Sequence, residues 1–320
     1  FTVPATARKG ITFARFRFTT QTSILDFTGQ GPVGEVEDYR VSIITDRERC
    51  DLDCEGREYW LTFPGNYAPD SDNPARLSFC VHGPAGTVVA ITAPGVGLST
   101  NIVIPAAQWT TVPLPRLLEL GDLNDGVTNK GIHVLASNPI GIQAFNHAKF
   151  TTDSYLALNA SVIGTEYVVQ SAPNLHVGVP PLNGTQFAIV ASDSNTVVTI
   201  TPSVATGGHP AGVPYNLVLQ PGDAYQLRNT NDAPADLTGT LIKSDKPIAV
   251  FGSHRCANMP SETEWFCDYL VEQMLPVNTW GNDFYTAPLA TRSGGDTFSL
   301  LAAYDNTDTY LNGAFITTLN

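Results

Sequence analysis

The sequence predicts an all-β fold made of tandem antiparallel β-sandwich repeats with few short helices. Short β-branched or alternating runs, bounded by Gly, Pro, Asn or Asp, recur along the whole chain. Gly and Pro supply 27 and 23 of the 320 residues, and charged residues make up only 15%, against about 25% in an average soluble domain. The chain also repeats its own pattern at an offset of roughly 110 residues.

The first part of the chain carries two predicted strands, Ile11–Thr19 and Val36–Ile44, joined by a loop rich in Gly and Pro. Two strands are too few to enclose a hydrophobic core. We therefore predict that residues 1–46 are the closing part of an upstream β domain.

The remainder predicts copies of one unit. GTVVAITAP from Gly86 returns as NTVVTITP from Asn195, and SNPIGIQAFNH from Ser137 returns as SDKPIAVFGSH from Ser244. DTFSLLAAYDNTDTYL from Asp296 matches TQFAIVASDSNTVVTI from Thr185. We predict a first sandwich repeat over residues 50–182, a second over 183–295, and the truncated start of a third over 296–320.

Within these repeats the strongest strand predictions are Thr87–Thr92, Ile140–Phe145, Phe187–Val190, Thr196–Ile200 and Pro247–Phe251. Only Pro115–Leu120 and Cys267–Met274 look briefly helical. The oxygen-rich segment GDLNDG, Gly121–Gly126, is typical of a turn, with a calcium loop as the alternative.

Charge and hydropathy exclude two classes of partner. The net charge is −13, with no basic run that would neutralise a phosphate backbone, so nucleic acid is not an expected partner. No apolar run reaches the ~18 residues of a membrane helix, so no membrane span is expected in this segment.

Three carboxylates, Glu35, Glu37 and Asp38, lie in the motif GEVEDYRVSI. Alternation along a strand places Glu35 and Glu37 at the core rim, where a carboxylate needs a partner. Arg15 and Arg17 on the preceding strand are the favoured partners, and a Ca²⁺ site is the alternative. No cofactor is expected to be required, with Ca²⁺ left open.

The five cysteines fall into two groups, with Cys54 and Cys80 in the first and Cys256 and Cys267 in the second. Disulfides are favoured at Cys256–Cys267 and Cys54–Cys80, with Cys50 as the next candidate for the second bridge. The rivals are a zinc site of His254, Cys256, Cys267 and Asp268, and a nucleophile pair of Cys256 with His254. The sequence lacks GxSxG, HExxH, Walker and CxxC motifs, which argues against an enzyme.

Several blocks resemble a known family. CDLDCEGREYWLTFPGNY from Cys50, KPIAVFGSHRCANMP from Lys246, CDYLVEQMLPVNTWGNDF from Cys267 and ATRSGGDTFSLLA from Ala290 resemble the N-terminal domain of IgG Fc-binding proteins. ARFRFTTQTSILDFTGQGPVGEVEDYRVSI, from Ala14, resembles the closing half of the bacterial GEVED domain. These resemblances imply a β fold, secretion and the Cys256–Cys267 bridge, and they leave the ligand open.

We therefore expect a non-enzymatic, extracellular bacterial surface or matrix protein. Its repeats would serve as structural or adhesive modules, and open sheet edges would lead to self-association, with a filament as one form of it. The alternative is a calcium-dependent binding module whose ligand is a glycan or an immunoglobulin-like host glycoprotein. A hydrolase is the third and least favoured hypothesis.

Overall fold

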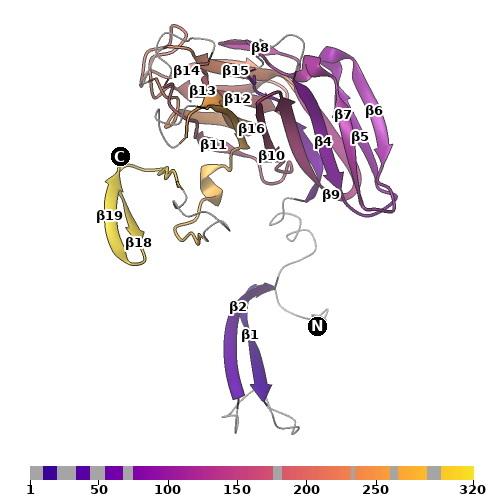
Figure 1. Cartoon of the computed structure of the whole chain (residues 1–320), viewed down its shortest axis with the longest axis vertical. Coiled ribbons are helices and arrows are strands. Elements are labelled where there is room, and N and C mark those ends of the chain that lie inside the picture. Colours follow the sequence, from indigo (N-terminus) through magenta and orange to yellow (C-terminus); the bar gives the residue numbers. More distant parts are fainter. Residues whose placement is uncertain are drawn as a thin grey trace. The chain divides into compact units, whose positions relative to one another are not determined.

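The computed structural model describes the backbone of residues 10–19 and 34–43, and residues 55–67, 75–175, 182–231, 235–259, 266–286 and 297–320 in full (Figure 1). The chain divides into two compact units, Phe1–Asp53 and Cys54–Asn320. The structure is nearly all β, as predicted, and its sheets are antiparallel.

The first unit contains one antiparallel pair, β1 (Gly10–Thr19) and β2 (Gly34–Ile43). The register places Arg15 opposite Asp38, whereas Glu37 and Glu35 stand opposite Phe16 and Phe18. Directly opposed residues share a face of a strand pair. The side chains of this pair lie outside what the structure describes, so the pairing of Glu35 and Glu37 with Arg15 and Arg17 stays a prediction.

The second unit begins with a sandwich whose two layers share one long strand. This strand, β9 (Ile132–Ala148), pairs first with β3 and β5 and then, further along, with β4 and β10. β6 and β7 extend the two layers outward. The other strands of this first repeat are β3 (Gly56–Leu61), β4 (Arg76–His82), β5 (Val88–Ala93), β6 (Leu98–Val103), β7 (Trp109–Leu114) and β10 (Thr151–Leu156).

The second repeat has the same strand order. Its long strand, β16 (Leu241–Ala257), pairs with β11 and β13 and then with β12 and β17, while β14 and β15 extend the layers. The remaining strands are β11 (Gly164–Val168), β12 (Thr185–Ala191), β13 (Thr196–Thr201), β14 (Tyr215–Leu219), β15 (Ala224–Asn229) and β17 (Asp268–Gln273). The duplication read from the sequence is therefore a duplication of topology.

The repeats start earlier than the predicted boundary at 182/183. β3 and β11 open the two copies, and in both the same hydrogen bond ties this strand to the long strand. Tyr59 donates its hydroxyl to the carbonyl of Ile140, and Tyr167 donates to that of Ile248. The second copy thus begins at Gly164, at the first strand of the same seven-strand order.

Both long strands change layers at a proline, Pro139 or Pro247, because a proline has no N–H to give to a continuous ladder. A polar side chain just before the proline accepts the N–H that the ladder leaves free. Ser137 Oγ accepts from the amide of Val88 at 3.0 Å, and Asp245 Oδ1 accepts from that of Val197 at 2.8 Å.

Each repeat has a core, but one layer of the second repeat is buried on both faces. All seven residues of β12 and all six of β15 are buried, whereas β4 alternates between buried and more exposed positions. Inward residues of repeat 2 form their own cluster. The outward apolar residues join the core of repeat 1, and we call them the covered face: Ala188, Val190, Ala224, Ala249, Phe251 and Val271.

A third copy of the hairpin β5–β6 stands at β18 (Thr307–Leu311) and β19 (Ala314–Leu319). Its entry repeats one turn of the earlier copies. Asn306 has a φ of 61°, and the hydroxyl of Thr307 donates to the carbonyl of Tyr304 at 2.7 Å. The equivalent residues Asn195 and Thr196 have the same arrangement.

The described helices are three 3₁₀ turns, at Pro94–Val96, Arg116–Leu118 and Val277–Thr279. The second lies within the predicted helical segment Pro115–Leu120. The other helical prediction, Cys267–Met274, is wrong. This segment forms β17, because pairing with β16 and alternate burial of Tyr269, Val271 and Gln273 favour a strand over the short helical pattern.

Candidate functional site

The most elaborate polar site in the described residues is the junction between the two repeats. The connection between β7 and β9, residues 121–131, leaves repeat 1 and lies along repeat 2, and we call it the strap. Its short strand β8 (Gly126–Thr128) pairs with β15. The predicted turn GDLNDG is the first half of this strap, and its oxygens accept hydrogen bonds from protein donors.

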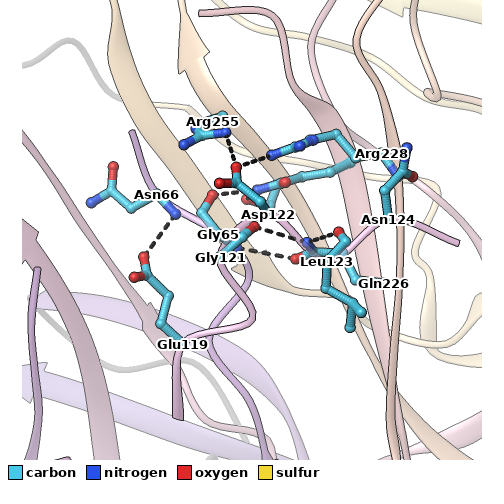
Figure 2. Close-up of polar contacts among 12 residues, drawn as sticks. Gly65, Asn66, Glu119, Gly121, Asp122, Leu123, Asn124, Gln226, Arg228 and Arg255 are labelled. Carbon is cyan, nitrogen blue, oxygen red and sulfur yellow. Dashed lines mark hydrogen bonds and ion pairs between the residues drawn. The ribbon is translucent and has the colours of Figure 1, made fainter. Parts of the chain in front are cut away.

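Asp122 lies at the centre of the junction and holds two arginines of repeat 2 (Figure 2). Its Oδ1 atom lies 3.1 Å from an Nη atom of Arg228 and 2.5 Å from one of Arg255. The carboxylate is 77% exposed, whereas the side chain of Arg228 is only 9% exposed. An exposed acid of repeat 1 therefore neutralises two mostly buried cations of repeat 2.

The electrostatics follow from this arrangement. Partial burial alone would raise the pKa of Asp122, but the charges of Arg255 and Arg228 and their hydrogen bonds outweigh it and lower the pKa below its ordinary value. Burial also lowers the pKa of Arg228. The Nε atoms of both arginines are buried and have no hydrogen-bond partner among the described residues, so Asp122 is their main compensation.

Gln226 fastens the strap by its side-chain amide. Its Nε2 donates to the carbonyls of Gly121 and Leu123, at 3.2 and 2.6 Å, and its Oε1 accepts from the amide of Gly65 at 3.0 Å. The approach is close enough to require glycine at position 65, because a Cβ there would lie 2.1 Å from the carbonyl oxygen of Gly121. The neighbouring Gln186 donates to the carbonyl of Gly65.

Asp125 gives the strap a second polar contact with repeat 2. Its Oδ1 atom accepts a hydrogen bond from the hydroxyl of Tyr225 at 2.8 Å, and its Oδ2 atom lies 3.0 Å from Nε2 of His209. The His209 ring stacks on Tyr215, with centroids 3.6 Å apart, and the two tyrosine hydroxyls lie 2.7 Å apart. Burial raises the pKa of Tyr215 to about 12, so the hydroxyl stays protonated at neutral pH.

The polar contacts of this junction join the first repeat to the second. Its acids are matched by arginine, tyrosine, histidine and backbone donors, and none is left beside a nucleophile. Among the residues that the structure describes, no group of three or more His, Cys, Asp or Glu side chains could hold a metal ion. The arrangement fixes the repeats in one relative orientation.

The predicted cysteine site is a disulfide in the structure, between Cys256 and Cys267, whose Cα atoms are 5.0 Å apart. Neither sulfur is then available to bind zinc or to act as a nucleophile. The Nδ1 atom of His254 instead accepts a hydrogen bond from the backbone amide of Cys256, and its Nε2 atom lies 3.0 Å from Oδ1 of Asn174. The thiol of Cys80 is free, in a central strand between Gln143 and Thr111. Cys54, its predicted partner, lies outside the described residues.

The side chains of Glu35, Glu37 and Asp38 lie outside what the structure describes, so a calcium site there stays a prediction. No described helix is long and apolar enough to span a bilayer.

Exposed valines form a repeated apolar surface, which we call the valine ridge. Val88 pairs with Val103 across β5 and β6, and Val197 pairs with Val218 across β13 and β14. All four side chains are exposed, and Val88 and Val197 stand at equivalent places in the two copies.

The junction residues Gln226, Arg228 and Arg255 were absent from our predictions. For Gln226 and Arg228 the signal was present in AYQLRN, where polar residues alternate with apolar ones along a strand. Such alternation usually indicates a solvent face, and only the position of the strap shows that this face is covered.

Comparison with known proteins agrees with the resemblance to IgG Fc-binding proteins, whereas the resemblance of the first segment to the GEVED domain stays a prediction. The family model described as IgGFc binding protein matches residues 153–320, just over half of the chain. The human IgGFc-binding protein is 28% identical over 278 residues, which cover 84% of this chain and 5% of the relative. The chain thus spans about a twentieth of that protein's length, and no solved structure matches it. Because this family model matches more than half of the chain, the chain belongs to the IgGFc-binding protein family.

Proposed function

We propose that this chain is a non-enzymatic extracellular binding module whose locked repeats present the valine ridge to a protein ligand. The family to which it belongs indicates a binding protein and not an enzyme. The observation that carries the proposal is the valine ridge itself, because the same exposed cross-strand pair recurs in both repeats. A rigid junction would keep the two pairs at a constant separation. The disulfide supports an extracellular location.

The candidate ligand is the Fc part of immunoglobulin G, after the name of the human relative. Apolar residues in the centre of an interface carry much of its free energy, and a charge placed there is destabilising. We therefore expect immobilised Fc to capture the full chain, with Fab fragments as the matched negative ligand.

The decisive variant is Val103→Glu with Val218→Glu, one valine from each pair. We expect at least a tenfold loss of affinity by surface plasmon resonance. The control is Leu117→Glu, which changes an exposed leucine away from the hairpins. Equal binding of Fc by the double variant would disprove the role of the valine ridge, and no binding of Fc by the parent chain would disprove the ligand.

The predicted filament role and calcium dependence remain predictions. Light scattering over a range of protein concentrations tests the first, and binding and melting with and without a chelator test the second.

A further inference from the structure

The two repeats differ at the positions of the covered face. The strand registers of β4–β9 and β12–β16 are superimposable, so Cys80 and Gln143 stand where Ala188 and Phe251 stand in repeat 2. In the same way His82 takes the place of Val190. Repeat 2 thus carries a small and apolar outward face, whereas repeat 1 carries polar or half-exposed side chains there.

Repeat 1 receives the covered face on a defined surface near the end of β10. The ring of Tyr155 packs edge-on against Phe251, with centroids 5.2 Å apart. The amide of Leu158 donates to Oε1 of Gln273 at 2.8 Å, and the hydroxyl of Tyr269 donates to the carbonyl of Pro64. Tyr155 and Leu158 are 1% and 7% exposed as a result.

The equivalent surface of repeat 2 is open. Register places Glu272 at the position of Tyr155, since they pair with the equivalent residues Gly252 and Ala144. The backbone continues in the same way. The amide of Met274 donates to the carbonyl of Val250, as the amide of Ala157 donates to that of Ile142, so the following residue Leu275 matches Leu158. Leu275 is 45% exposed, against 7% for its counterpart.

The third copy carries the complementary pattern. The match of its sequence to β12 places Ser299 and Leu301 where repeat 2 has Ala188 and Val190. These residues are small or apolar, like those of the covered face and unlike Cys80 and His82 of repeat 1.

We propose that the surface around Glu272 and Leu275 is a docking site for the outward sheet face of a further copy of this repeat. Repeats of this type then stack in one direction only, because the first repeat has a polar outward face that ends the stack, as the end repeats of solenoid arrays do. The inference does not depend on the ligand proposed above.

The test gives repeat 1 the face of repeat 2. The variant Cys80→Ala, His82→Val and Gln143→Phe is made in the full chain, and its mass is measured by light scattering between about 1 and 100 μM, the range in which weak standard-size interfaces form. We expect the parent to stay monomeric and the variant to form head-to-tail oligomers. Adding Leu275→Arg should restore the monomer, whereas adding Leu241→Arg, at an exposed leucine elsewhere, should not.

A variant that remains monomeric at every concentration, or oligomers that persist with Leu275→Arg, would overturn the proposal. Circular dichroism checks that each variant is folded. If the triple variant does not fold, a second variant provides the test. In it, residues 164–280 are duplicated by inserting a further copy directly after Trp280, at the repeat boundary. We expect amide exchange at Leu275 to slow at least tenfold in that protein, and an unchanged rate would refute the docking site.

Discussion

Removal of the Asp122 carboxylate is the most direct test of the junction. In Asp122→Ala, two guanidinium groups lose their anionic partner, and that of Arg228 stays buried. Hydrogen bonds to charged groups contribute about 1.5–3 kcal/mol each. Because Asp122 is largely exposed and therefore screened, we expect the two together to contribute about 2–4 kcal/mol to the free energy of unfolding.

The assay is urea unfolding at pH 7, followed by far-ultraviolet circular dichroism. A cycle with Arg228→Met isolates the pair, and we expect the double variant to lose less than the sum of the single losses, by at least about 0.5 kcal/mol. Asp193→Ala, at an exposed turn, serves as the control. A loss for Asp122→Ala no larger than that of the control, or strict additivity in the cycle, would refute the view that this carboxylate compensates buried charge.

Three further changes probe the core shared by the two repeats, the disulfide, and Glu272 beside the charge of Asp153. Phe251→Ala should lower the free energy of unfolding by about 3–5 kcal/mol, while Phe150→Ala, at an exposed ring, should change it by less than about 0.5 kcal/mol; equal effects would contradict the shared core. Replacing Cys256 and Cys267 by Ala should cost about 2–4 kcal/mol, and a reductant should then have no added effect on the melting temperature. Burial, and next the charge of Asp153, raise the pKa of Glu272 to about 7; the folded protein thus holds this proton more tightly than the unfolded chain, and stability falls as pH rises from about 4.5 through 7. Glu272→Gln should flatten this part of the profile, and an unchanged slope between pH 5 and 8 would refute the assignment.

Much of the fold is readable from the sequence because strand periodicity and duplication are local signals. The runs at Thr196–Ile200 and Pro247–Phe251 lie inside β13 and β16, and the echo of Ser137 at Ser244 marks the bends of the two long strands. The repeat boundary was placed too late because β11, with the sequence GTEYV, is short and weakly patterned, and only its pairing with β16 identifies it as an opening strand.

The junction was less accessible to sequence reasoning. GDLNDG taken alone is typical of a turn. Its hydrogen-bond donors include Arg228 and Arg255, which lie more than one hundred residues away and cannot be identified from the motif. Likewise the apolar outward positions Ala188 and Val190 read as ordinary strand residues, because burial of a second face depends on a neighbour that the strand itself does not encode.

The covered face also bears on how such a chain is made. Repeat 1 leaves the ribosome first. The residues of its receiving surface, such as Tyr155 and Leu158, are therefore synthesised before the apolar strands of repeat 2. If repeat 1 folds as it is made, the apolar outward face of repeat 2 can pack against it soon after synthesis. Synthesis from the amino end onward would then shorten the exposure of the apolar outward strands of repeat 2, and with it the opportunity for aggregation.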